Sequence, residues 1–170
     1  MFDYDGKHLL IDAVCTHDEA LLDMEVGKAC LAEVARTIGM TMIMDPVGVQ
    51  FPHDGAAGGA IPRPFRQPPG AAGEASGGYS AFVMLAESHI SLHTFPEAHF
   101  LTFDCYSCKG FDHALAEACL DRFFGLREQN VQVIAREFPG TARGRAASNA
   151  GETHSTLRLA SPRQEKRGQA

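Results

Sequence analysis

Three runs with the composition of β-strands follow one another in the second half of the chain, and the links between them are very short. The runs are Tyr79 to Leu85, Ile90 to Phe95 and Ala98 to Cys108. Apolar and polar side chains alternate in the third run, which is typical of a strand with one buried face. Links of this length pair neighbouring strands antiparallel. The segment therefore predicts an antiparallel meander, and this restricts the fold more than any other feature.

The sequence before the meander predicts a strand, a helix and a second strand. Residues 7–15 alternate in the manner of a strand, and Asp18 can cap a helix that ends at Gly39. The apolar run Met40 to Met44 stands just before Asp45-Pro46 and predicts the second strand. The expected apolar stripe of the helix is Leu22, Val26, Ala29, Cys30 and Val34.

After the meander, Asp112 to Leu126 predicts a second helix and Val131 to Ala135 a last strand. Such an order, with hairpin links in its middle, favours an α+β fold in which helices pack on one face of a mainly antiparallel sheet, as a two-layer sandwich. The expected stripe of the second helix is Leu115, Ala118, Cys119 and Phe123.

Two stretches do not fit a packed core. Residues 52–78 hold most of the prolines and many of the glycines, which predicts a long mobile loop. Residues 141–170 are polar and basic with few large apolar groups, which predicts a disordered tail. We therefore expect one domain, residues 1–140, followed by that tail.

Composition limits the partners and the compartment. The net charge of -6 and the hydrophobic content of 45% fit a soluble globular protein and disfavour nucleic acid as a partner. No signal peptide or membrane-length apolar run is present, so we expect a cytoplasmic protein without a membrane partner. Five unevenly spaced cysteines make a disulfide framework an unattractive interpretation.

Residues able to do chemistry gather between Ser80 and Gly110. Serines, histidines, carboxylates and two cysteines stand there within about thirty positions. In an extended strand Ser91, His93 and Phe95 point to one face, with Ser88 expected nearby. Any candidate active site is therefore expected in this segment.

The segment AESHISLHTFPE, followed by a strand that ends in D-C-Y-S-C, resembles the processing and active-site region of the prokaryotic S-adenosylmethionine decarboxylase family. Gly6-Lys7-His8 and Asp12 are similar to that family's N-terminal strand. The resemblance covers roughly residues 5–137, apart from the proline-rich loop. Phe95 stands where the family usually has Trp, and Tyr106 to Lys109 replaces its Phe-Thr-Cys-Gly.

The resemblance implies a proenzyme that cuts itself between Glu87 and Ser88 into chains 1–87 and 88–170. The Ser88 hydroxyl attacks the Glu87 carbonyl, elimination follows, and Ser88 becomes a covalently bound pyruvoyl group, so that no external cofactor is needed. That keto group forms a Schiff base with the substrate. The reaction implied is decarboxylation of S-adenosylmethionine for spermidine synthesis, in a homodimer whose active site can lie between subunits.

The resemblance also assigns roles. His93 is the processing base, Ser80 assists processing by hydrogen bonding, and Cys108 is the acid that returns a proton to the substrate. Phe95 stacks on the adenine, and Glu97 contributes to substrate binding. No metal site is implied.

Other interpretations stay open at this level. A homologous decarboxylase of a basic amino acid, arginine or ornithine, is the second choice within the enzyme class. Cys105-x-x-Cys108 with His89 and His93 could hold zinc, although an extended strand points the two sulfurs apart. A non-catalytic homologue that serves as a binding subunit is the third interpretation. Cys105, Cys30 and Cys119 are expected to be core residues.

Overall fold

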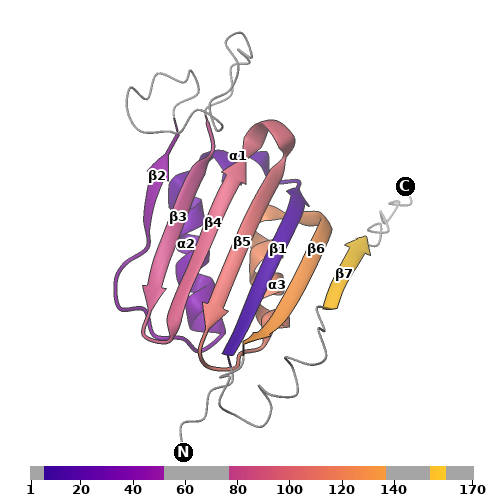
Figure 1. Ribbon diagram of the computed structural model, residues 1–170. Coiled ribbons are helices and arrows are strands. Elements are labelled where there is room, and N and C mark those ends of the chain that lie inside the picture. The colour runs from indigo at the N-terminus through magenta and orange to yellow at the C-terminus, as the bar shows by residue number, and fades with distance from the viewer. Residues whose placement is uncertain (1–5, 52–76, 137–153, 160–170) are drawn as a thin grey trace, which may run out of the picture.

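The described part of the chain forms one antiparallel sheet with three α-helices packed on one of its faces (Figure 1). The computed structural model describes residues 6–51, 77–136 and 154–159. In these residues the strands lie in the order β2-β3-β4-β5-β1-β6-β7. The predicted α+β class, with helices on one face of an antiparallel sheet, is confirmed.

The strands and helices have the following bounds. The strands are β1 (Gly6–Cys15), β2 (Val47–Gln50), β3 (Tyr79–Leu85), β4 (Ser88–Phe95), β5 (Phe100–Ser107), β6 (Leu126–Arg136) and β7 (His154–Leu159). The helices are α1 (Asp18–Leu22), α2 (Met24–Thr37), α3 (His113–Phe124) and the short 3-10 helix η2 (Pro96–Ala98).

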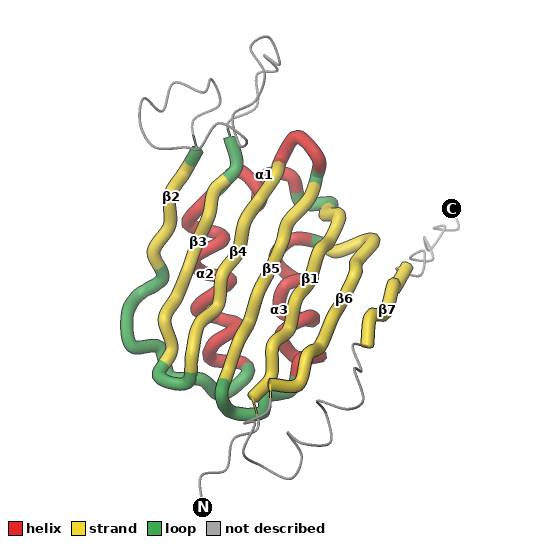
Figure 2. Tube along the Cα trace, in the orientation of Figure 1, coloured by secondary structure: helices red, strands yellow, loops and turns green. Residues whose placement is uncertain are grey.

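The meander of β3, β4 and β5 is present as predicted, and β1 continues the sheet on its far side. β4 pairs with β3 and β5, and β1 lies between β5 and β6. Side chains of β1 alternate between the two faces of the sheet: Leu9 and Ile11 have no exposed surface, while Leu10 between them is partly exposed. The buried side chains face the helices, which lie behind the sheet in the view of Figure 2.

The first predicted helix is two helices. The chain breaks at Asp23, whose side chain accepts a hydrogen bond from the Glu25 backbone N–H at 2.9 Å and so caps α2. Asp18 lies inside α1 instead of capping a long helix. The buried face of α2 is Gly27, Cys30, Leu31, Val34 and Ala35, so Cys30 and Val34 of the expected stripe are confirmed and Ala29, which is exposed, is wrong.

The predicted face of α3 is also corrected. Leu115 is 45% exposed and Ala118 is exposed, while Cys119 is buried as expected. The buried set is Ala116, Glu117, Cys119, Leu120 and Phe124. A shift of one residue turns a helix by about 100°, and packing against α2 and the sheet selects the face.

The predicted strand Met40 to Met44 is wrong. Only Met42 makes an isolated bridge, to Leu85, and the edge strand β2 begins after Pro46 instead. Met40 is 7% exposed and packs in the core after α2. An apolar side chain at this position is explained by burial and does not require a strand.

The predicted loop and tail fall mostly on residues 52–76, 137–153 and 160–170, which lie outside the described residues. Within the expected tail, however, His154–Leu159 form β7, which pairs with β6. Disorder throughout 141–170 is therefore wrong for these six positions. The β6 edge offers unpaired backbone groups, and backbone pairing does not require a large apolar core.

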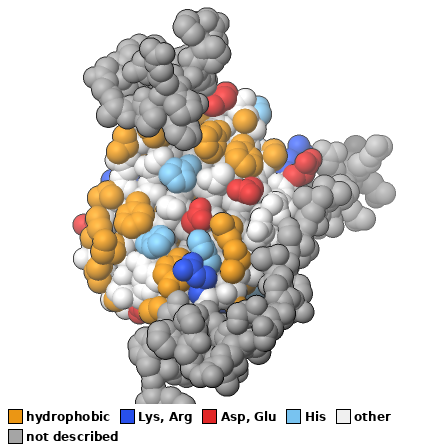
Figure 3. Space-filling model, viewed as in Figure 1, with side chains coloured by type: hydrophobic (Ala, Val, Ile, Leu, Met, Phe, Trp, Pro, Cys, Tyr) orange, Lys and Arg blue, Asp and Glu red, His pale blue; other side chains and the backbone are white. Residues whose placement is uncertain are grey.

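The face of the sheet away from the helices, the open face, carries the polar side chains of the meander. Figure 3 shows histidine and acidic side chains near its middle and apolar side chains along the β2 edge. Val47, Val49 and Met84 at that edge are 48%, 62% and 43% exposed. In cross-strand rows the open face runs Met84, His89, Tyr106 and His8; then Phe82, Ser91, Asp104 and Leu10; then Ser80, His93, Thr102 and Asp12; then Phe95, Phe100 and Val14.

Within the described ranges, none of the helices combines the length and the apolar character that crossing a membrane requires.

A test of the packing is the close approach of Gly27 to Tyr79. A Cβ at position 27 would overlap the Tyr79 ring, which is fully buried and whose hydroxyl donates to the Ala20 carbonyl at 2.9 Å. Alanine favours helix by about 1 kcal/mol over glycine. We nevertheless expect Gly27→Ala to lower the free energy of unfolding by about 1–3 kcal/mol, because the buried, hydrogen-bonded Tyr79 ring cannot move aside without disturbing its neighbours. Urea unfolding measures this, and a stabilised variant would contradict the packing.

Candidate active site

The predicted cleavage site lies in a tight turn at one end of the sheet. Ala86 and Glu87 form a two-residue turn between β3 and β4, and Leu85 pairs with Ser88 across it. The Ser88 hydroxyl contacts the carbonyl oxygen of Glu87. The nucleophile and the carbonyl group expected to react are therefore side by side without any rearrangement of the strands.

A single backbone N–H faces both groups. The Cys108 amide donates to the Glu87 carbonyl oxygen at 3.1 Å and to Ser88 Oγ, also at 3.1 Å. In the pairing of β4 with β5, Ser88 lies opposite Ser107. The next residue, Cys108, therefore lies beside the turn, where its N–H reaches both groups. A fixed N–H at a carbonyl oxygen stabilises negative charge that develops there.

The Ser80 and His93 side chains are brought together as a cross-strand pair. They are opposite one another on β3 and β4, and Ser80 Oγ lies 2.7 Å from His93 Nδ1. His93 comes five positions after Ser88 along an extended strand, and this spacing places their Cα atoms about 17 Å apart. The structure therefore does not bring this pair to the cleavage site within one chain.

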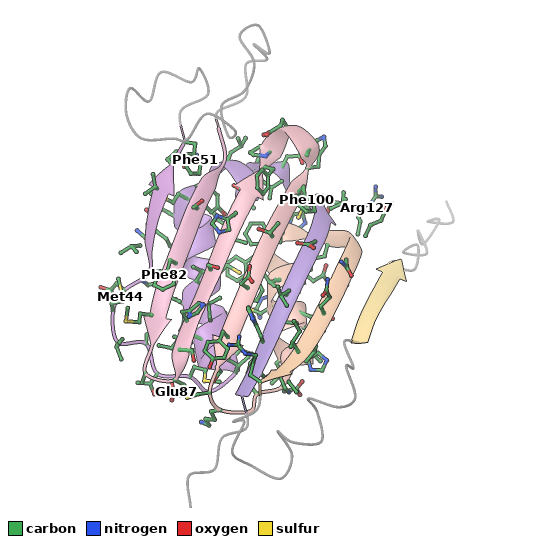
Figure 4. All side chains as sticks on the ribbon, in the orientation of Figure 1. Met44, Phe51, Phe82, Glu87, Phe100 and Arg127 are labelled. Atoms are coloured by element: carbon green, nitrogen blue, oxygen red, sulfur yellow. The ribbon has the colours of Figure 1, made fainter. Side chains whose placement is uncertain are left out.

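Phe95 and Glu97 lie still farther from the turn. Phe95 ends β4, is 40% exposed, and has its ring centroid 5.8 Å from that of Phe100. Glu97 lies in η2 just beyond. Figure 4 shows Phe100 and Glu87 at opposite ends of the sheet. Thus the predicted site residues form two groups, one at each end of β4.

Ser88 does not share the face of Ser91, His93 and Phe95. Ile90 and Leu92 have no exposed surface, so the even-numbered positions of β4 face the helices. Ser88 has that parity but stands at the strand's first position, where it is only half-buried. Ser91, His93 and Phe95 share one face as expected, and Ser88, which was expected near them, has the opposite parity at the start of the strand.

Beside the turn, an aromatic row on the open face was not singled out from the sequence. His89 stacks with Phe82 at 5.7 Å between ring centroids and lies 5.7 Å from the Tyr106 ring. His8 Nε2 lies 3.2 Å from Asp104 Oδ1 and packs edge-on against Tyr106. The alternation in β4 and β5 could have indicated these neighbours, once the register was known.

The zinc interpretation is not supported by the geometry. Cys105 has no exposed surface, and burial raises its pKa to about 12, with the Asp104 charge adding to the shift. Cys108 is half-buried at the end of β5. In the part of the chain that the structure describes, no three His, Cys, Asp or Glu side chains are grouped to hold a metal ion.

Cys30 and Cys119 are core residues, as predicted. Both are buried where α2 meets α3. A hydrogen bond from Cys30 and the nearby Arg122 lower the pKa of Cys119, while the residue is only 3% exposed. Burial therefore keeps reagents away from this thiol.

Known proteins share sequence and fold with this chain. A family model described as S-adenosylmethionine decarboxylase matches residues 70–137, which include β3, β4, β5, α3 and β6. The solved adenosylmethionine decarboxylase of Aquifex aeolicus has the same fold, with a TM-score of 0.58 and 24% identity. The match covers 81% of this chain and 94% of that one.

Curated relatives carry the same name. The S-adenosylmethionine decarboxylase proenzyme of Symbiobacterium thermophilum is 30% identical over 114 residues, which is 67% of each protein. The proenzyme of Brevibacillus brevis is 29% identical over 103 residues, and that of Pyrobaculum aerophilum 45% over 59. These matches cover 61% and 34% of this chain, and the chain spans 59% and 46% of the two relatives' lengths.

Thiol labelling tests the exposure of Cys108. It is the one cysteine of the five that is not buried, and burial keeps Cys15 and Cys105 protonated by raising the pKa of each to about 12. We expect iodoacetamide at pH 8 to modify Cys108 first in the folded protein, as located by peptide mass spectrometry. Equal or faster labelling of Cys119 would show that the α2–α3 contact opens and would contradict this.

Proposed function

The chain belongs to the S-adenosylmethionine decarboxylase family, and on that basis we propose that it cuts itself between Glu87 and Ser88 and then decarboxylates S-adenosylmethionine. The observation that carries the proposal is the Cys108 N–H, which donates to both the Glu87 carbonyl oxygen and Ser88 Oγ. The name proenzyme, borne by the relatives, supports self-cleavage, and their named substrate favours S-adenosylmethionine over a basic amino acid.

Cleavage begins at the turn. Ser88 Oγ attacks the Glu87 carbonyl carbon and loses its proton to a base, while the Cys108 N–H stabilises the oxygen that becomes negative. The C–N bond then breaks, which leaves Glu87 esterified to Ser88 Oγ and frees the Ser88 amine. Removal of the Ser88 Cα proton expels the Glu87 carboxylate and gives dehydroalanine. Water replaces its nitrogen as ammonia, and a pyruvoyl group remains at position 88.

Decarboxylation uses the same end of the sheet. The pyruvoyl keto group supplies the electron sink for the pair left behind when carbon dioxide departs. Cys108 lies within backbone hydrogen-bond distance of Ser88 Oγ, so its half-buried thiol is near enough to return a proton to the substrate α-carbon. The aromatic row of His89, Phe82 and Tyr106 lines the open face beside it.

The processing base and the adenine contact come, we propose, from a second copy of the chain. His93 and Phe95 are exposed on the open face, but about 17 Å or more from Ser88 along a rigid strand. A twofold packing of two open faces with their strands reversed sets the Ser88 end of one against the His93 end of the other. The homodimer thus completes the site, and Ser80 holds the His93 ring through their hydrogen bond.

We also propose that the protein works in the cytoplasm. All five cysteines are unpaired, and four of them are buried, which suits a reducing compartment.

Two substitutions separate the cleavage step from decarboxylation. Ser88→Ala removes the nucleophile, so neither cleavage nor release of carbon dioxide from carboxyl-labelled S-adenosylmethionine is expected. Cys108→Ala keeps the backbone N–H, so we expect normal cleavage with kcat lowered by about 10²- to 10⁴-fold. Decarboxylation by Ser88→Ala, or loss of cleavage in a folded Cys108→Ala protein, would contradict the assignment.

Complementation tests the shared site. Ser88→Ala supplies His93 but cannot be cut, whereas His93→Ala can be cut only if a partner supplies the base. We expect neither variant to be cleaved alone and the His93→Ala chain to be cleaved when both are co-expressed. Differently tagged chains on a gel distinguish the two. Cleavage of His93→Ala alone at the wild-type rate would show that His93 of the partner subunit is not the base.

A further inference from the structure

The cleavage turn is held on a second side, by the segment that follows α2. Residues 40–43 run antiparallel to the end of β3. Ile43 N–H donates to the Met84 carbonyl at 3.1 Å, and Ala86 N–H donates to the Thr41 carbonyl at 2.8 Å. Between these bonds lies the bridge from Met42 to Leu85. We call residues 40–43 the clamp segment.

One contact of the clamp segment involves the side chain of the residue that is cut. Glu87 Oε2 accepts a hydrogen bond from the Thr41 backbone N–H at 3.1 Å. Thr41 thus binds the turn twice, at the Ala86 N–H and at the Glu87 carboxylate. The carbonyl group of the same residue accepts from Cys108 N–H on the opposite side.

We propose that the Glu87 side chain is a positioning group for self-cleavage, which acts by anchoring the peptide to Thr41. This rests on the proposed function and deepens it. With the side chain fixed at Thr41 and the carbonyl oxygen fixed at Cys108, rotation of the Glu87 peptide is restricted from both sides. The carbonyl carbon then stays within reach of Ser88 Oγ, which raises the fraction of chains in a reactive geometry.

The clamp segment is itself well fixed. Met40 is 7% exposed and accepts a contact from the buried Ser107 hydroxyl at 3.7 Å, while its N–H donates to the Ala35 carbonyl of α2 at 2.8 Å. Gly39 precedes it with a φ of +71°, the left-handed conformation that turns the chain out of the helix. The anchor of Glu87 is therefore tied to both the helix layer and β5.

The anchor needs an acceptor atom at the right reach and does not need a negative charge. Glutamine has a carbonyl oxygen at the same distance from the backbone, whereas aspartate has the charge but is one methylene shorter. A role as general base makes the opposite demand, because an amide cannot take up a proton. The two roles therefore predict different orders of cleavage rate among the variants.

The experiment follows cleavage of the full chain after cell-free synthesis, by gel electrophoresis over time. We expect Glu87→Gln to be cut within about threefold of the wild-type rate, and Glu87→Ala and Glu87→Asp to be slowed about tenfold or more, as loss of one hydrogen bond allows. We also expect the pH dependence of the Glu87→Gln rate to match that of the wild type. Glu19→Ala, which removes an exposed carboxylate from α1 on the helix side, is the matched control.

Each outcome decides one point. A wild-type chain that never cuts itself overturns the proposed function, and this inference with it. A wild-type chain that cuts while Glu87→Ala cuts equally fast overturns the inference alone. A slow Glu87→Gln with a faster Glu87→Asp shows that charge matters instead of reach, and also overturns it. Near-ultraviolet circular dichroism of each uncut variant, matched to that of Ser88→Ala, separates slow chemistry from misfolding.

Discussion

The Cys108 backbone N–H, shared between the Glu87 carbonyl oxygen and Ser88 Oγ, is the contact on which the account of this protein depends. It exists only because β5 pairs with β4 in a register that puts Ser107 opposite Ser88. A shift of one residue would carry a different amide to the turn and turn every side chain of the strand to the other face. The packed core that fixes this register is therefore also what forms the proposed cleavage site.

The same rigidity separates the groups to which the proposed mechanism assigns roles. Ser88 and Cys108 lie at one end of the sheet, and the hydrogen-bonded pair of Ser80 and His93 lies about 17 Å along it. A strand in the middle of a sheet cannot bend to close such a gap. The proposed twofold packing of open faces solves the problem without any movement within the chain, and it gives the polar side chains of that face a function.

Much of the fold could be predicted from the sequence, because the meander and β1 show clear alternation and their links are short. The helix faces could not, since Leu115 and Ala116 differ by one position and only packing decides which is buried. The sequence wrongly predicts a strand at Met40, because burial and strand formation favour the same apolar residues. β7 has no signal of its own that composition could reveal.

Part of the candidate site could also be predicted from the sequence, and part could not. The motif around Ser88 identified Glu87, Ser88 and Cys108, which the structure brings together. The distance from Ser88 to His93 could have been foreseen, because five extended residues cannot fold back within one strand. Thr41 could not have been found from the sequence, since it acts through its backbone and lies 46 residues before Glu87.

The most direct test of the central claim is the intact mass of the purified protein under reducing, denaturing conditions. The account predicts two chains that meet between residues 87 and 88. The second chain should be lighter than its serine-terminated sequence by the mass of one ammonia molecule, as a pyruvoyl group requires. A single chain of 170 residues that stays uncut over days would contradict the account.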